Sequence, residues 1–189
     1  MFEHVTVLLS FVFAIALTHV LTSSTELIWA RKRLRFSWLQ ALWMASAVIS
    51  IVVNWVALAP LNAIKNWSPQ EIVIQFVAAI VQYYTCSLIS LRPEKEGVVD
   101  MPAFYQAERH SIFAAYSILM LVSMFQNVWD ARTYHLDGAD LFKANGLVLV
   151  MLASTVAAGW AKPNWLQWVA AIVMLALQTY FLAAYAITM

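Results

Sequence analysis

Six long stretches without a charged residue constrain this chain more than any other feature of its sequence. Each stretch is 18 to 29 residues long, and every Lys, Arg, Asp and Glu lies outside them. About 20 helical residues cross a hydrocarbon layer of about 30 Å, so each stretch is long enough, or nearly so, for one membrane-spanning helix. The stretches are residues 4–25, 36–64, 72–91, 110–129, 144–161 and 163–189.

The composition agrees with a lipid environment and excludes several classes of protein. Charged residues make up 11% of the chain, against about 25% in an ordinary soluble domain. The net charge of +1 offers no basic surface for nucleic acid. The single cysteine, Cys86, excludes an internal disulfide and a cysteine-based metal cluster. The sequence contains no recognisable catalytic motif, which argues against an enzyme, and we expect no metal and no cofactor.

The sequence therefore predicts an all-α, multi-pass membrane protein, a compact bundle of six transmembrane helices that forms a single domain without a soluble part. The predicted spans are residues 5–30, 38–59, 69–91, 110–129, 144–161 and 165–187. Cytoplasmic loops hold the excess of Lys and Arg, and eight of these residues fall on one side of the bundle against three on the other. The eight are Arg31, Lys32, Arg33, Arg35, Arg92, Lys95, Arg109 and Lys162, and the three are Lys65, Arg132 and Lys143. This count predicts that both termini lie outside a cell membrane, and the general character of the chain is that of a bacterial inner-membrane protein.

Capping signals predict where several helices start, because a short polar side chain three residues before a Glu or Gln satisfies free backbone N–H groups. The signals are Ser37 with Gln40, Ser68 with Glu71, and Asn164 with Gln167. Asp100, followed by Pro102, is expected to cap a further helix, which begins before the membrane and enters it near Arg109.

One internal similarity suggests a duplication. Residues 75–81 (QFVAAIV) match residues 167–173 (QWVAAIV) at six of seven positions. A true duplication would divide the chain into two three-helix repeats of opposite orientation, residues 1–92 and 100–189, a plan found in many transporters. The alternative is a chance match in a sequence rich in Ala, Val and Ile.

Polar residues inside a membrane are costly, so those within the stretches are candidates for function. The first stretch and its end carry His19, Thr22, Ser23 and Glu26, whose helical spacing places them on one face. One interpretation is a proton or cation relay, since histidine titrates near neutral pH. The other is that His19 forms an interhelical hydrogen bond while Glu26 pairs with a nearby arginine at the membrane surface.

The next three helices carry further polar residues at helical spacing, which predict a polar lining formed by helices 1 to 4. Single stripes of this kind are also ordinary contacts between membrane helices. The predicted lining residues are Ser50, Asn54, Gln75, Gln82, Tyr116, Ser123 and Asn127, with Trp43, Ser46 and Cys86 on the same stripes.

Four residues are expected at similar depth near the cytoplasmic surface: Arg92, Glu108, Arg109 and His110. As a group they would form a charged mouth to the polar cavity. Alternatively, Arg109 only marks the end of a helix, as the excess of basic residues in cytoplasmic loops predicts.

These patterns favour a small channel or transporter for protons, cations or small solutes, with a path along helices 1 to 4. The main alternative is a non-catalytic accessory or scaffold subunit of a larger membrane complex. A lipid-acting enzyme or a receptor is a more distant alternative. The expected partners are the lipid bilayer and either further copies of the chain or other membrane subunits.

Overall fold

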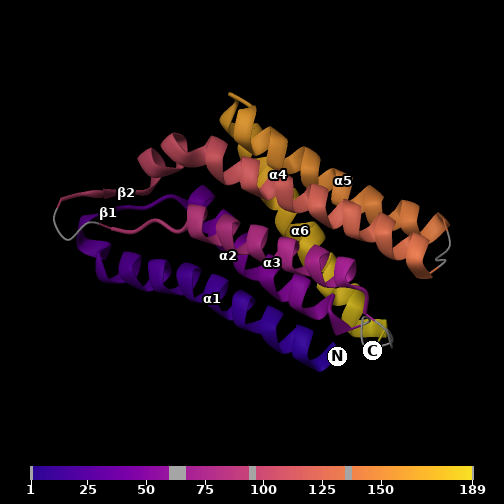
Figure 1. Cartoon of the computed structure of the whole chain (residues 1–189). Helices are drawn as coiled ribbons and strands as arrows, with labels where there is room; N and C mark the ends of the chain where they lie inside the picture. The colour runs from indigo at the N-terminus through magenta and orange to yellow at the C-terminus, as the bar shows by residue number, and fades with distance from the viewer. Residues whose placement is uncertain (1, 60–66, 94–96, 135–137, 189) are drawn as a thin grey trace.

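The protein is a bundle of six long helices in the computed structural model, which describes residues 2–59, 67–93, 97–134 and 138–188. A short 3-10 helix, η1 (Arg31–Arg33), and two two-residue strands, β1 (Leu34–Arg35) and β2 (Val99–Asp100), lie in the connections at one end (Figure 1). The helices are α1 (Phe2–Trp29), α2 (Trp38–Val56), α3 (Pro69–Ile89), α4 (Met101–Tyr134), α5 (Gly138–Trp160) and α6 (Asn164–Thr188).

All six helices are long and apolar enough to cross a membrane, which confirms the predicted fold class. The shortest, α2, has 19 residues and is therefore about 29 Å long, close to the thickness of a hydrocarbon layer. Successive helices run in opposite directions, so both ends of the chain lie at one end of the bundle, here called the terminal end (Figure 1). The protein is thus a multi-pass membrane protein.

The helices form a closed ring in the order α1, α3, α4, α5, α6, α2, in which each helix contacts the next. Helix α2 also contacts α3 and α4, which fills the middle of the ring. The four largest fully buried side chains, Trp43, Tyr105, Tyr116 and Phe113, belong to α2 and α4. The core is therefore centred on α2 rather than on an open axis.

The caps confirm most of the predicted helix starts. Ser37 accepts a hydrogen bond from the Gln40 N–H, and Ser68 forms a full capping box with Glu71. Asp100 Oδ1 accepts from the Ala103 N–H at 2.9 Å, so α4 begins at Met101, well before its predicted span.

The third signal, Asn164, was wrong as a cap. Helix α6 already includes Asn164, and the Gln167 side chain donates to the Ala161 carbonyl instead of reaching back to the backbone N–H of residue 164. The proline before Asn164 provides the reason, since the Pro163 carbonyl accepts from the Leu166 N–H and starts the helix one residue early. The predicted duplication stays a prediction.

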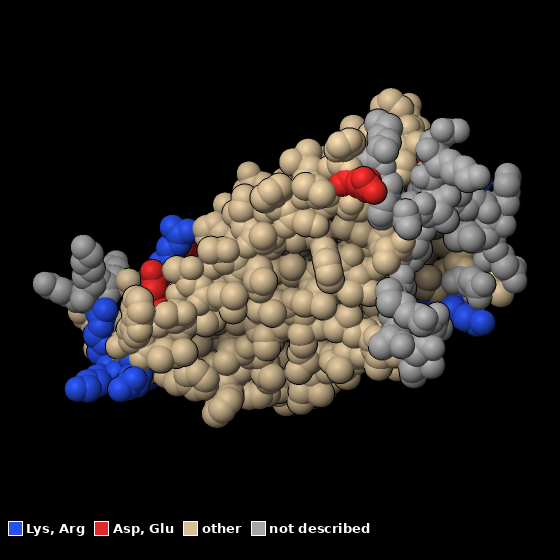
Figure 2. All heavy atoms as spheres, turned by 90° about the horizontal axis from the view of Figure 1, so that it is seen from below, with Lys and Arg blue, Asp and Glu red and all other residues tan. Residues whose placement is uncertain are grey.

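Charges gather toward the two ends of the bundle, with an uncharged belt between them on the face that Figure 2 shows. The end opposite the termini carries Arg31, Lys32, Arg33 and Arg35 and is here called the basic end. There β1 pairs with β2 in parallel, Arg35 forms an ion pair with Asp100, and Arg33 donates to the Gly97 carbonyl at 2.9 Å. Lys65 and Lys95, which entered the orientation count, lie outside the described residues, and the orientation in the membrane stays a prediction.

Helices α4 and α5 lie very close together at Gly159. A Cβ atom at this position would lie 2.9 Å from Phe113 Cβ, which is closer than packed carbon atoms can come. One turn earlier, Thr155 forms a 2.9 Å hydrogen bond with Ser117 of α4. The missing side chain of Gly159 therefore allows this pair of helices to pack.

Replacing Gly159 with alanine is expected to lower the free energy of unfolding by about 1–3 kcal/mol, since the Phe113 Cβ cannot swing away. The matched control is Gly146→Ala in the same helix, where an added Cβ meets nothing within 4 Å. That variant should be neutral or gain up to about 1 kcal/mol from helix propensity. Denaturation in mixed detergent–lipid micelles measures both, and equal stabilities would contradict the close approach.

Candidate functional site

The interior of the bundle contains a chain of side-chain hydrogen bonds between helices. On α2, Ser46 donates to Gln178 Oε1 of α6 at 2.9 Å. One turn further along α2, Ser50 and then Asn54 both donate to Gln82 Oε1 of α3, at 2.9 and 2.8 Å. Gln82 is fully buried, and its amide nitrogen donates to Cys86 Sγ. These bonds satisfy polar groups that would otherwise face hydrocarbon.

Two more hydrogen bonds continue this polar interior toward the terminal end. Gln126 of α4 donates to Gln75 of α3 at 3.1 Å. Its neighbour Asn127 donates to Asn145 of α5 at 3.0 Å. The polar interior is therefore formed by helices α2 to α6, in contrast to the predicted lining by helices 1 to 4.

Two cavities lie beside these hydrogen bonds, with volumes of about 180 and 120 Å³. They share the lining residues Asn54, Ala57, Gln126 and Asn127, so they are neighbours. Five of the seven predicted lining residues are found here. Ser50 and Ser123 line the larger cavity, Gln75 lines the smaller one, and Asn54 and Asn127 line both.

In the part of the chain that the structure describes, one charged residue lines these cavities. It is Asp130, which lies near the terminal end of α4 and lines the smaller cavity. It is half-buried and within electrostatic reach of Glu71, the buried capping residue of α3. Two carboxylates therefore lie near one another where the polar interior approaches the terminal end.

A cluster of buried aromatic rings on α2 and α4 lies between the cavities and the basic end. Trp43 of α2 contacts Phe113 at 4.6 Å and Tyr116 at 5.7 Å between ring centroids, and Phe113 also contacts Tyr105. All four rings are 2% exposed or less. We call these four residues the aromatic barrier. Tyr116, predicted to line the cavity, belongs to this barrier, and its hydroxyl lies 3.5 Å from the Trp43 carbonyl oxygen.

The stripe on α1 forms a separate site. His19, Thr22, Ser23 and Glu26 line one pocket of about 270 Å³, as their spacing predicts, and Arg92 completes it. No residue lines both this pocket and the interior cavities. The structure thus divides the predicted path into an interior part and a part between α1 and the end of α3.

Contacts of His19 define its tautomer. Arg92 Nη2 lies 3.2 Å from His19 Nδ1, and a guanidinium can only donate, so Nδ1 is the acceptor. The ring proton is therefore on Nε2, which lies 3.1 Å from the Tyr83 hydroxyl oxygen and donates to it. Ser23 donates to the Leu91 carbonyl at 2.6 Å beside this pair. Both ring nitrogens of His19 thus hold α1 against α3 and the residues that follow it.

The four residues predicted at the cytoplasmic mouth are not together. Arg92 lies beside His19, whereas Arg109 points to the other side of the bundle, where Nη1 lies 3.4 Å from the Ala161 carbonyl oxygen. His110 packs against Trp160 with ring centroids 5.8 Å apart, and Glu108 is half-buried on α4. The four residues therefore form two groups. Arg92 lies after the end of α3, beside α1, and the other three residues lie on α4.

Several residues of the interior escaped the sequence reasoning. Gln126 and Asp130 lie on α4, Asn145 on α5 and Gln178 on α6. The four-residue step from Gln126 to Asp130 is a helical signal, but Asp130 falls just outside a charge-free stretch. Gln178, in contrast, is a strongly polar residue in a mainly apolar helix, and such residues in membrane helices usually face the interior.

In the described ranges, no group of three or more His, Cys, Asp and Glu residues is placed to hold a metal ion. In comparisons with protein families, curated proteins and solved structures, no match to this chain was found. The function is therefore argued from the geometry of the chain's own residues.

Proposed function

We propose that this protein moves small cations or small polar solutes across a membrane through the polar interior formed by α2 to α6. The observation that carries the proposal is the pair of neighbouring cavities lined by amide and hydroxyl side chains. Interhelical contacts alone need isolated hydrogen bonds, whereas six amide and hydroxyl side chains line the larger cavity among otherwise apolar walls.

The charge of the lining supports cations over anions. Asp130 lines the smaller cavity, with Glu71 nearby, and among the described residues that line the two cavities none is Lys or Arg. Rings or pairs of acidic side chains favour cations in membrane pathways. Their negative charge replaces part of the attraction that a cation loses when its hydrating water is removed. A neutral solute would be bound through the amides of Asn127 and Gln126 in the same place.

The aromatic barrier would close the proposed path on the side of the basic end. The cavities lie on its terminal side, so substrate would enter from the terminal end and wait for the barrier to open toward the basic end. With the basic end in the cytoplasm of a bacterial cell, as the excess of Lys and Arg favours, entry would be from outside. Opening of a barrier on one side of a binding site, after entry from the other side, is the ordinary way in which a transporter exposes that site to the two sides in turn.

Cysteine accessibility tests the path directly, since the chain has one cysteine, Cys86. In a Cys86→Ser background in liposomes, Ser123→Cys and Asn127→Cys should react with a membrane-impermeant thiol reagent added on the terminal side. Gln40→Cys, at a fully buried position one turn beyond Trp43 toward the basic end, should stay protected and serves as the matched control. Protection of all three positions would contradict an entrance at this end.

Flux through purified protein completes the test. Liposomes that contain the protein alone should take up potassium or a small neutral solute faster than empty liposomes. If the chain instead purifies with a second membrane protein in fixed stoichiometry and shows no flux alone, the accessory-subunit alternative is correct.

A further inference from the structure

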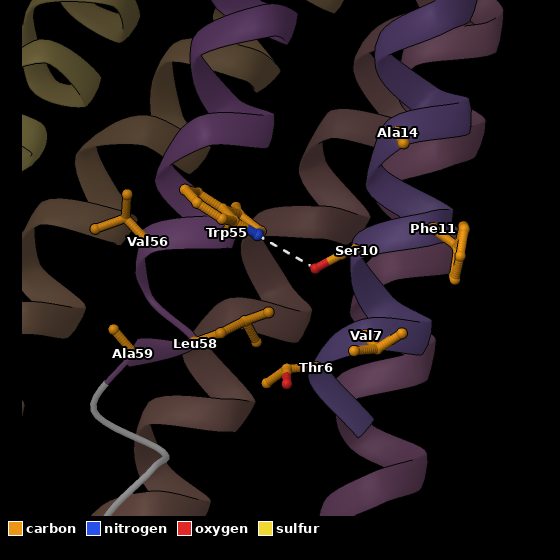
Figure 3. A pocket seen from close by; sticks show the side chains of 9 residues that line it. All are labelled: Thr6, Val7, Ser10, Phe11, Ala14, Trp55, Val56, Leu58 and Ala59. Atoms are coloured by element: carbon orange, nitrogen blue, oxygen red, sulfur yellow. Dashed lines mark hydrogen bonds between the residues drawn. The ribbon is translucent and has the colours of Figure 1, made fainter. Parts of the chain in front are cut away.

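The seam between α1 and α2 is open along much of its length, and two apolar grooves lie on it. The groove near the terminal end, here called the terminal groove, has a volume of about 650 Å³ (Figure 3). Trp55 of α2 reaches across it and donates to Ser10 of α1 at 3.2 Å. The second groove, here called the basic groove, has a volume of about 470 Å³ and lies between the same helices at the other end.

The two grooves differ in charge. The terminal groove is lined by residues of both helices, and none of the described lining residues is charged (Figure 3). The basic groove is lined by apolar residues of both helices and by one cation, Arg31. Arg31 is exposed, and Lys32, Arg33 and Arg35 follow within four residues. An apolar trough that ends at an exposed cation is complementary to a molecule with an apolar tail and an anionic head.

The position of the basic groove suits the depth of a lipid in one leaflet. Trp29 and Trp38, which are 78% and 70% exposed, flank Arg31 in the sequence, and exposed tryptophans are typical of the head-group level. From Ile28 to Val20 the groove follows α1 for about 12 Å, most of the roughly 15 Å of one hydrocarbon leaflet.

We propose that the basic groove binds an anionic phospholipid, with one acyl chain between α1 and α2 and the phosphate on Arg31. Small side chains form part of the floor, among them Ala41, Ala45 and Ser24, which leaves room for the chain. A guanidinium binds phosphate oxygens through two donors, so Arg31 provides a more specific contact than a general positive surface. This site is independent of the proposed transport path, which lies on the other side of α2.

Native mass spectrometry of the full chain in mild detergent tests the proposal. The probes are dioleoyl phosphatidylglycerol and dioleoyl phosphatidylcholine, which have the same tails and differ in head-group charge. One phosphatidylglycerol should bind about fivefold more tightly than phosphatidylcholine, as expected for one basic side chain at a lipid head group. Millimolar inorganic phosphate should not displace it, because phosphate alone lacks the acyl chain. Equal binding of the two lipids, or displacement by phosphate, would overturn the proposal.

Two pairs of variants separate a defined site from general attraction. Arg31→Gln should weaken phosphatidylglycerol binding about fivefold, whereas Lys32→Gln, an exposed neighbour that does not line the groove, should change it less than twofold. Ala45→Phe should fill the basic groove and weaken binding without a change in charge. Ala14→Phe, in the terminal groove, is its matched control and should have no effect.

Ala14 and Ala45 are both exposed, so the substitutions need not disturb the core. If Ala45→Phe does not fold, Ala45→Leu gives the same comparison. Equal losses in Arg31→Gln and Lys32→Gln would overturn the proposal, as would unchanged binding in the variant that fills the basic groove.

Discussion

Replacement of Trp43 by alanine is expected to lower the free energy of unfolding by about 3–5 kcal/mol, the cost of emptying a fully buried tryptophan site. Its ring contacts both Phe113 and Tyr116, so their packing is lost with it. If the rings act as a barrier, the same variant should also make liposomes leaky to small cations. Denaturation in mixed micelles and passive flux measure the two effects separately.

Trp38 provides the matched control for this variant, since it lies on the same helix but is 70% exposed. Trp38→Ala should cost much less stability and leave liposomes tight. Trp43→Phe keeps an aromatic ring in the barrier and should fall between the two. A stable, tight Trp43→Ala variant would show that the aromatic cluster is not the closure of the pathway.

Asp130→Asn is expected to reduce cation flux about tenfold or more while the flux of a neutral solute changes little. A carboxylate about 8 Å from a passing cation contributes about 2 kcal/mol at an effective dielectric constant near 20, which corresponds to more than a tenfold change. Asparagine has almost the same shape, so the variant removes charge without filling the cavity. Potassium uptake into liposomes, compared with uptake of a neutral solute, measures the difference.

Glu108→Gln is the matched control, since Glu108 lies on the same helix toward the basic end and does not line the cavities. It should leave flux unchanged. His19→Leu then tests the relay predicted on α1. Loss of flux in His19→Leu with normal flux in Asp130→Asn would place the path along α1, against the proposal made above.

The fold could be predicted from the sequence because a lipid environment leaves few alternatives. The charge-free stretches located all six helices, and capping chemistry placed the starts of α2, α3 and α4 at Ser37, Ser68 and Asp100. The close approach at Gly159 could not be foreseen, since glycine near the end of a helix is ordinary unless the opposing helix is known. Such a contact depends on which helices are neighbours, and helical periodicity does not contain that information.

The candidate site was predictable to a similar extent. Helical spacing identified the polar faces correctly, including the one that brings His19, Thr22, Ser23 and Glu26 into one pocket. It could not show that this face meets Arg92 while the face of α2 meets Gln82 and Gln178. Helical spacing shows which residues share a face of one helix. The residues that this face contacts depend on the order of the helices around the ring.

Asp100 joins two parts of the chain that are far apart in sequence. One carboxylate oxygen caps α4 through the Ala103 N–H, and the other pairs with Arg35 just before α2, beside the β1–β2 pair. The first turns of α2 and α4 are therefore mechanically coupled at the basic end, and these two helices carry all four rings of the aromatic barrier. Any rearrangement that separates the rings by moving α2 away from α4 would have to stretch or break the ion pair between Arg35 and Asp100.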